Sequence, residues 1–186
     1  KLGLNLISGN AVEMPSLPKV NGLMQAWFLG SETGHAIADV ISGDVNPSGK
    51  LPFTFPVKLE DNSAHHYGEL SYPGDSINQY YKEGIFVGYR WHDTKKVKPL
   101  FAFGHGLSYS SFEISNAKAD KQTYTAGEQI RLTCKVNNTS KVDGAEVVQV
   151  YVGKADSKVE RAMKELKAFQ KITVSAEGEK AVKLII

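Results

Sequence analysis

Residues 99–112 read PLFAFGHGLSYSSF, a stretch in which four aromatic side chains flank a Gly104-His105-Gly106 step. A nucleotide-binding loop would need a third glycine and a following helix, and this stretch has neither. A core strand would tolerate two such closely spaced glycines poorly. A packed junction explains both features, because aromatic side chains can pin a connector against a domain while glycines let the backbone turn sharply. The stretch therefore predicts a junction between two parts of the chain.

The residues before this junction are typical of a layered α/β domain. The apolar run at 4–10 ends in Ser-Gly-Asn, which predicts a buried strand and a turn. A second helix is predicted over 33–41 and a short strand over 51–55. A first helix is predicted before them, because apolar side chains recur with helical spacing at Val20, Leu23, Met24, Trp27 and Phe28. Residues 1–56 are too few to bury a core alone, so we expect them to be a piece of a larger domain.

The residues on either side of the junction differ in pattern. Residues 57–98 are polar and tyrosine-rich without a sustained period, which indicates an ordered connector containing a strand at 85–91. From about residue 110 the apolar residues alternate. Short strands are predicted at 128–140, 144–155, 164–174 and 180–186. This spacing predicts an all-β sandwich, whose last strands we expect to be missing because a sandwich has about 100 residues.

Composition excludes several classes of function. The net charge is +2 and the basic residues are scattered, which argues against nucleic-acid binding. No apolar run approaches the roughly 20 residues of a membrane span. The single cysteine, Cys134, lies in an alternating apolar row and is interpreted as a small buried hydrophobe. The five histidines show no ligand spacing, so neither a metal site nor a cofactor is expected. The opening Lys1 without an initiator Met suggests that the sequence begins within a longer protein, so the missing signal peptide gives no information on localisation.

Four segments, taken in order, resemble glycoside hydrolase family 3, the β-glucosidase and β-xylosidase group. These segments are AWFLGSETGHAIADVISGDVNPSGKLPFTFP (26–56), YKEGIFVGYRWHD (81–93), the junction itself, and the pair GAEVVQVYV with KELKAFQKI. The resemblance covers essentially the whole chain. It implies that residues 1–56 are the C-terminal part of an α/β sandwich domain, 57–108 a connector packed on it, and 109–186 an incomplete fibronectin-III-like domain.

The resemblance also implies a chemistry. Members of this family cleave β-linked glucosides with retention, using two carboxyl groups about 5–5.5 Å apart. The nucleophilic Asp lies in an N-terminal barrel, and the acid/base Glu precedes the segment that begins at Lys1. The resemblance therefore implies a β-glucosidase parent acting on terminal β-D-glucosyl residues, with β-xylosides as the alternative substrate. It implies that no catalytic residue lies in this chain, that the chain alone is inactive, and that its partner is the missing barrel domain. Relatives of this architecture are commonly periplasmic or secreted.

Three residues are candidates for the rim of the sugar pocket. Glu32 precedes a predicted helix, where a carboxylate can cap free N–H groups or, alternatively, shape the pocket. Trp91 can stack on a sugar or pack between domains. Arg90 precedes it, and in a strand the two side chains would point to opposite faces.

The competing interpretation of the whole chain is a non-catalytic module that binds carbohydrate or protein through the sandwich. Such a module would usually expose aromatic side chains in its loops. After Phe112 the only aromatics are Tyr124, Tyr151 and Phe169, and the last two lie in apolar strand contexts.

Overall fold

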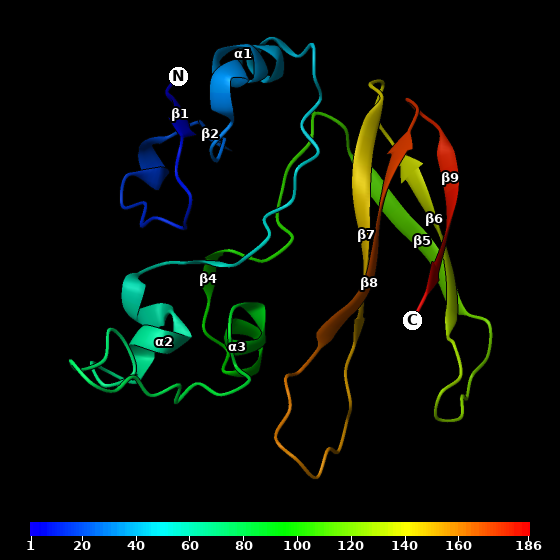
Figure 1. Cartoon of the computed structure of the whole chain (residues 1–186). Helices are drawn as coiled ribbons and strands as arrows, with labels where there is room; N and C mark the ends of the chain where they lie inside the picture. The colour runs from blue at the N-terminus through cyan, green and yellow to red at the C-terminus, as the bar shows by residue number, and fades with distance from the viewer. The chain divides into compact units, whose positions relative to one another are not determined.

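The computed structural model describes all residues, 1–186, and divides into two compact units (Figure 1). The first unit comprises residues 1–44, 51–105 and 155–163, and the second comprises 45–50, 106–154 and 164–186. Two short segments are therefore exchanged between the units. Residues 45–50 belong to the second unit although the residues on either side belong to the first, and residues 155–163 belong to the first although the residues on either side belong to the second. The boundaries suggested at residues 56 and 108 stay predictions.

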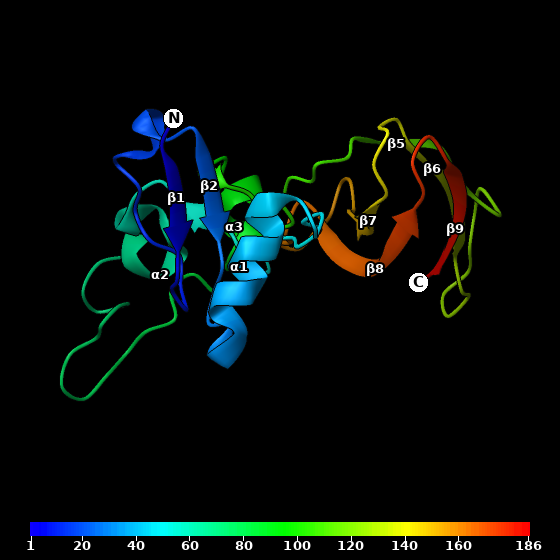
Figure 2. The ribbon, with the colours of Figure 1, turned by 90° about the horizontal axis from the view of Figure 1, so that it is seen from above.

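The first unit begins with two parallel strands, β1 (Gly3–Leu6) and β2 (Gly22–Gln25), paired from Gly3 opposite Gly22. The 3₁₀ turn η1 (Leu17–Lys19) lies between them in sequence. The turn η2 (Gly30–Glu32) leads into α1 (Thr33–Ser42), which lies beside the strand pair in both views (Figures 1 and 2). Helix α1 ends at Gly43, whose φ of 90° is readily adopted only by glycine. The helix predicted at 33–41 is confirmed, and the run at 4–10 begins with strand β1 as expected, although none of its residues is buried.

The helix predicted over Val20–Phe28 is wrong, because this segment forms strand β2. Periodicity alone cannot separate a short apolar strand from a helix. Here the hydrogen bonds to β1 are decisive, and Trp27 has a φ of 56°, which no α-helix tolerates.

The rest of the first unit consists of short elements around aromatic side chains. Strand β3 (Phe55–Pro56) pairs antiparallel with β4 (Pro99–Phe101). The turn η3 (Leu59–Asp61) and helix α2 (Ser63–His66) follow β3, and helix α3 (Tyr89–Thr94) precedes β4. The strand predicted at 85–91 is wrong. Gly84 and Gly88 have φ values of 56° and 55°, which interrupt an extended chain, and the N–H groups of Trp91 and His92 bond to the Gly88 carbonyl to start α3.

The second unit is an antiparallel β-sandwich. One sheet has the order β5 (Phe112–Ala119), β6 (Arg131–Asn138) and β9 (Glu179–Ile185), and the other pairs β7 (Gly144–Val152) with β8 (Glu165–Val174). Side chains from both sheets form one buried core: Cys134, Val136, Val148, Ile172, Val174, Val182 and Leu184. The predicted strands are confirmed at β6, β7, β8 and β9, because alternating residues of these segments face that core.

Candidate functional site

The first half of the junction stretch belongs to the first unit and packs against residues 51–55. The Gly104 N–H donates to the Leu51 carbonyl, and the Leu51 N–H donates to the His105 carbonyl, both at 2.8 Å. The Phe101 ring contacts the edge of Phe55 and stacks on His105. These contacts fix the backbone where two glycines would otherwise leave it mobile. No helix follows, so a phosphate-binding loop is excluded here.

The second half belongs to the second unit and is anchored by residues 45–50. Asn46 Oδ1 accepts hydrogen bonds from Ser108 Oγ and the Tyr109 N–H, both at 2.8 Å. Its Nδ2 donates to Ser110 Oγ at 2.9 Å and to the Asp143 carbonyl at 2.8 Å. The half-buried Asn46 amide thus forms hydrogen bonds through both its N–H groups and its oxygen, and every partner lies 62 to 97 residues further along the chain.

Lys50 provides a second anchor in the same unit. Its Nζ donates to the Gly106 carbonyl at 2.7 Å and pairs with Glu146 Oε1 at 2.8 Å, with both side chains largely buried. A Cβ on Gly106 would lie 2.1 Å from the Gly49 carbonyl oxygen, so glycine is required by close approach. The sequence indicated only turn chemistry at 43–50. The roles of Asn46 and Lys50 were missed, because their partners are distant in sequence.

Glu32 occupies the N-cap position of α1, but its side chain caps no backbone N–H. Its Oε2 instead lies 2.8 Å from His35 Nδ1, with both side chains exposed. The expected capping bond is therefore not formed, and a role for Glu32 at a pocket rim stays a prediction.

Trp91 is 2% exposed, and its indole N–H donates to the Asp61 carbonyl at 3.0 Å. Its ring packs against His66 and Tyr67, so α3 and α2 are joined through it. The alternation expected for Arg90 and Trp91 is wrong, because both lie in α3, where successive side chains are about 100° apart. The buried Trp91 ring offers no open face to a sugar in this structure. Glu32 does not lie beside Trp91 in sequence or in the same helix, because it stands at the exposed start of α1.

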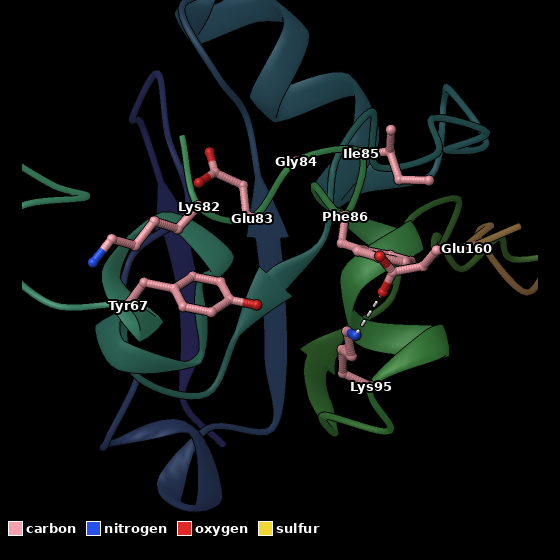
Figure 3. Close-up of a pocket in the computed structure, with 8 residues that line it drawn as sticks. All are labelled: Tyr67, Lys82, Glu83, Gly84, Ile85, Phe86, Lys95 and Glu160. Atoms are coloured by element: carbon pink, nitrogen blue, oxygen red, sulfur yellow. Dashed lines mark hydrogen bonds and ion pairs between the residues drawn. The ribbon is translucent and has the colours of Figure 1, made fainter. Parts of the chain in front are cut away.

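A surface pocket of about 340 Å³ lies in the first unit (Figure 3). It is lined by Tyr67, Lys82, Glu83, Gly84, Ile85, Phe86, Lys95 and Glu160. Lys95 Nζ lies 4.4 Å from the centre of the Phe86 ring and 3.4 Å from Glu160 Oε1, so this cation is engaged by both. Glu83 is 7% exposed, and the one hydrogen bond of its carboxylate, from Ser71 Oγ to Oε2, is 3.5 Å long. The pocket thus combines aromatic rings with a buried carboxylate that no basic side chain of this chain pairs with.

The remaining reactive side chains have structural partners. Burial raises the pKa of the Cys134 thiol, which keeps it protonated and unreactive in the sandwich core, as expected for a buried hydrophobe. His92 Nδ1 donates to the Val97 carbonyl, and His65 packs on Tyr72. No three His, Cys, Asp or Glu side chains are grouped as metal ligands. No helix has the length and apolar character required to cross a membrane.

These observations define a protein in which an α/β unit is combined with a fibronectin-like β-sandwich. Residues 4–89 match the glycosyl hydrolase family 3 C-terminal domain, and residues 146–186 match the fibronectin type III-like domain. The chain belongs to glycoside hydrolase family 3, as the sequence motifs indicated.

Similar proteins match over nearly the whole chain. β-Glucosidase BoGH3A from Bacteroides ovatus is 54% identical over 181 residues, which are 97% of this chain and 24% of that protein. Thermostable β-glucosidase B from Acetivibrio thermocellus is 47% identical, over 95% of this chain and 23% of its own length. The structure of DesR, a β-glucosidase from Streptomyces venezuelae in complex with D-glucose, superposes with a TM-score of 0.92 at 38% identity. That match covers 99% of this chain and 23% of DesR. The chain thus spans about a quarter of the length of these relatives.

Proposed function

We propose that this chain is the C-terminal part of a retaining β-glucosidase that hydrolyses terminal β-D-glucosyl residues. The observation that carries the proposal is the 54% identity to a β-glucosidase across 97% of the chain. The alternative substrate within the same chemistry is a β-xyloside. By analogy with relatives of this architecture, the parent protein would be periplasmic or secreted.

In this proposal the two catalytic carboxyl groups belong to parts of the parent outside residues 1–186. Retaining hydrolysis needs a nucleophilic carboxylate and an acid/base carboxyl on opposite sides of the anomeric carbon. Glu32 is exposed and engaged by His35, and Glu83 is a single buried carboxylate whose pocket neighbour Glu160 is engaged by Lys95. These placements suit supporting roles. The contribution of this chain would be to complete the α/β domain and to brace it through the connector.

The proposal is tested by hydrolysis of p-nitrophenyl β-D-glucoside by the 186-residue chain and by the parent protein in parallel. We expect turnover by the parent only, with glucose released first as the β-anomer in an NMR time course. The p-nitrophenyl β-D-xyloside serves as the substrate control. Turnover by the 186 residues alone would contradict the placement of the carboxyl groups, and Glu32→Gln and Glu83→Gln would then identify the residue responsible. A parent inactive on both substrates would refute the proposed activity.

A further inference from the structure

The segment between α2 and α3 exposes an unusual amount of apolar surface. We call residues 67–87 the docking loop. Most of it extends away from both helices in Figure 2. Its large exposed side chains are Tyr67, Leu70, Tyr72, Ile77, Tyr80, Tyr81, Ile85 and Val87, of which Ile77 is 88% exposed. Scattered apolar residues are normal on a protein surface, but eight within 21 residues mark an interaction site.

The docking loop has a defined shape. The Asp75 carboxylate accepts a hydrogen bond from the Ile77 N–H at 2.7 Å, and the Asp75 N–H donates to the Asn78 carbonyl at 2.9 Å. A Cβ on Gly74 would lie 2.6 Å from the Asn78 carbonyl oxygen, so this turn closes tightly. The Tyr80 N–H donates to the Leu70 carbonyl at 2.9 Å and ties the two arms together. These bonds hold Ile77 outward at the turn, which lowers the entropy lost when a partner covers it.

The pocket at the base of the docking loop favours a partner with a positively charged side chain. Figure 3 shows the Lys82 side chain extending away from the Glu83 carboxylate, and Lys95 lies beside Glu160. A largely buried carboxylate whose one hydrogen bond is long gains from a cation that reaches it through the pocket. The charged residues of the loop are acidic in excess: Glu69, Asp75 and Glu83 against Lys82. An arginine or lysine entering the pocket would meet Glu83 and the ring of Tyr67.

We infer that the docking loop binds a segment of the parent polypeptide outside residues 1–186, and that an Arg or Lys of this segment enters the pocket and pairs with Glu83. The inference rests on the proposed function, because it requires a parent of the same kind as the relatives. This chain covers only 24% of the length of BoGH3A and 23% of DesR, so most of such a protein is available to cover the loop. The partner surface is apolar and basic, complementary to the loop.

Site-specific photocrosslinking in the parent protein tests where the docking loop binds. Tyr81 is replaced by the photoreactive residue benzoylphenylalanine, and Phe169, a similarly exposed aromatic on β8, is replaced in a matched control. We expect the probe at position 81 to couple to a peptide outside residues 1–186 of the same molecule, and the probe at 169 not to label that peptide. Coupling confined to residues 1–186, a product of doubled mass, or no product at position 81 would overturn the inference.

A substitution at the turn provides a second measurement on the parent. Ile77→Asp places a charge on a side chain that is 88% exposed within this chain, and Leu107→Asp does the same at a loop position of the second unit that is 79% exposed. If the docking loop is covered, Ile77→Asp lowers the melting temperature of the transition in which this part of the parent unfolds by about 2–4 °C, and Leu107→Asp has little effect. Equal shifts for the two variants, or no shift for Ile77→Asp, would overturn the inference.

The cation is tested by a double-mutant cycle. The Arg or Lys nearest the crosslinked position is changed to Met, alone and together with Glu83→Gln. We expect the melting temperatures to be non-additive, because each single change leaves one charge unpaired. Additive shifts would refute the pairing. These experiments need no activity, so an inactive parent that still gives the crosslink refutes the proposed function and leaves the docking loop inference intact.

Discussion

The Asn46 side chain offers the sharpest test of how residues 45–50 hold the second unit. Asn46→Ala removes four hydrogen bonds, to Ser108, Tyr109, Ser110 and Asp143, each 2.8–2.9 Å long. A hydrogen bond contributes about 0.5–1.5 kcal/mol net, and exposed groups regain water, so we expect a loss of about 2–3 kcal/mol.

Asn46→Asp is the matched variant, because it keeps the acceptor and loses both donors. Its carboxylate would face the Asp143 carbonyl oxygen where an N–H group now donates. We therefore expect Asn46→Asp to retain the bonds from Ser108 and Tyr109 while weakening the contact with Asp143. The two variants separate the contributions of the two ends of the amide.

The assay is hydrogen exchange of the β6 and β7 amides at increasing urea, which reports on the sandwich even if the two units unfold separately. At a slope of about 2 kcal/mol per M, the loss in Asn46→Ala corresponds to a shift of about 1 M in the exchange midpoint. The Tyr109 amide should lose protection in Asn46→Ala and keep it in Asn46→Asp. A shift below about 0.2 M for Asn46→Ala would refute the role of this amide as an anchor.

Three further predictions concern other parts of the chain. Gly106→Ala should destabilise the second unit, because the added Cβ would overlap the Gly49 carbonyl oxygen. Urea unfolding would measure the loss, and an unchanged midpoint would contradict the close approach. Trp91→Phe should cost about 1–3 kcal/mol through loss of the indole N–H bond and of packing, measured by thermal unfolding of the first unit; a neutral change would show that the ring is not buried. The hydrogen bond from the Tyr124 hydroxyl lowers the pKa of Asp120. The stability that the ionised Asp120 carboxylate contributes is therefore present above about pH 4 and is lost as the pH falls through the lowered pKa. The urea midpoint of the unsubstituted protein should therefore fall at acid pH, and this fall should be smaller in Asp120→Asn. The same dependence of the midpoint on pH in both proteins would refute the linkage.

The sandwich could be predicted from sequence because its information is local. In β6, Cys134, Val136 and Asn138 are buried while the residues between them are more exposed, and the same alternation is visible in the sequence. Phe169 shows the limit of this reasoning. It lies in an apolar strand context, yet it is 67% exposed, because its neighbours in β8 supply the face that packs on the core.

The first unit was predicted less well because its elements depend on contacts beyond the local pattern. The residues of β2 suit one face of a helix, but pairing with β1 determines their conformation. The residues of α3 follow two glycines with positive φ, and the run predicted as a strand instead forms a helix that begins at Tyr89, after the N-cap Gly88. The candidate rim residues were chosen by resemblance, and the structure places Trp91 in packing between helices.

The anchors at residues 45–50 explain why a short segment between two parts of the first unit can fold with the second. Residues 45–50 form neither a helix nor a strand, so side chains hold them in place. The two that do so, Asn46 and Lys50, lie near the two ends of the segment. Their partners include the residues just after the Gly104-His105-Gly106 step, where the chain again passes into the second unit. The close approach of Gly106 to Gly49 brings the two passages of the chain together, and this requirement accounts for the glycine in the stretch PLFAFGHGLSYSSF.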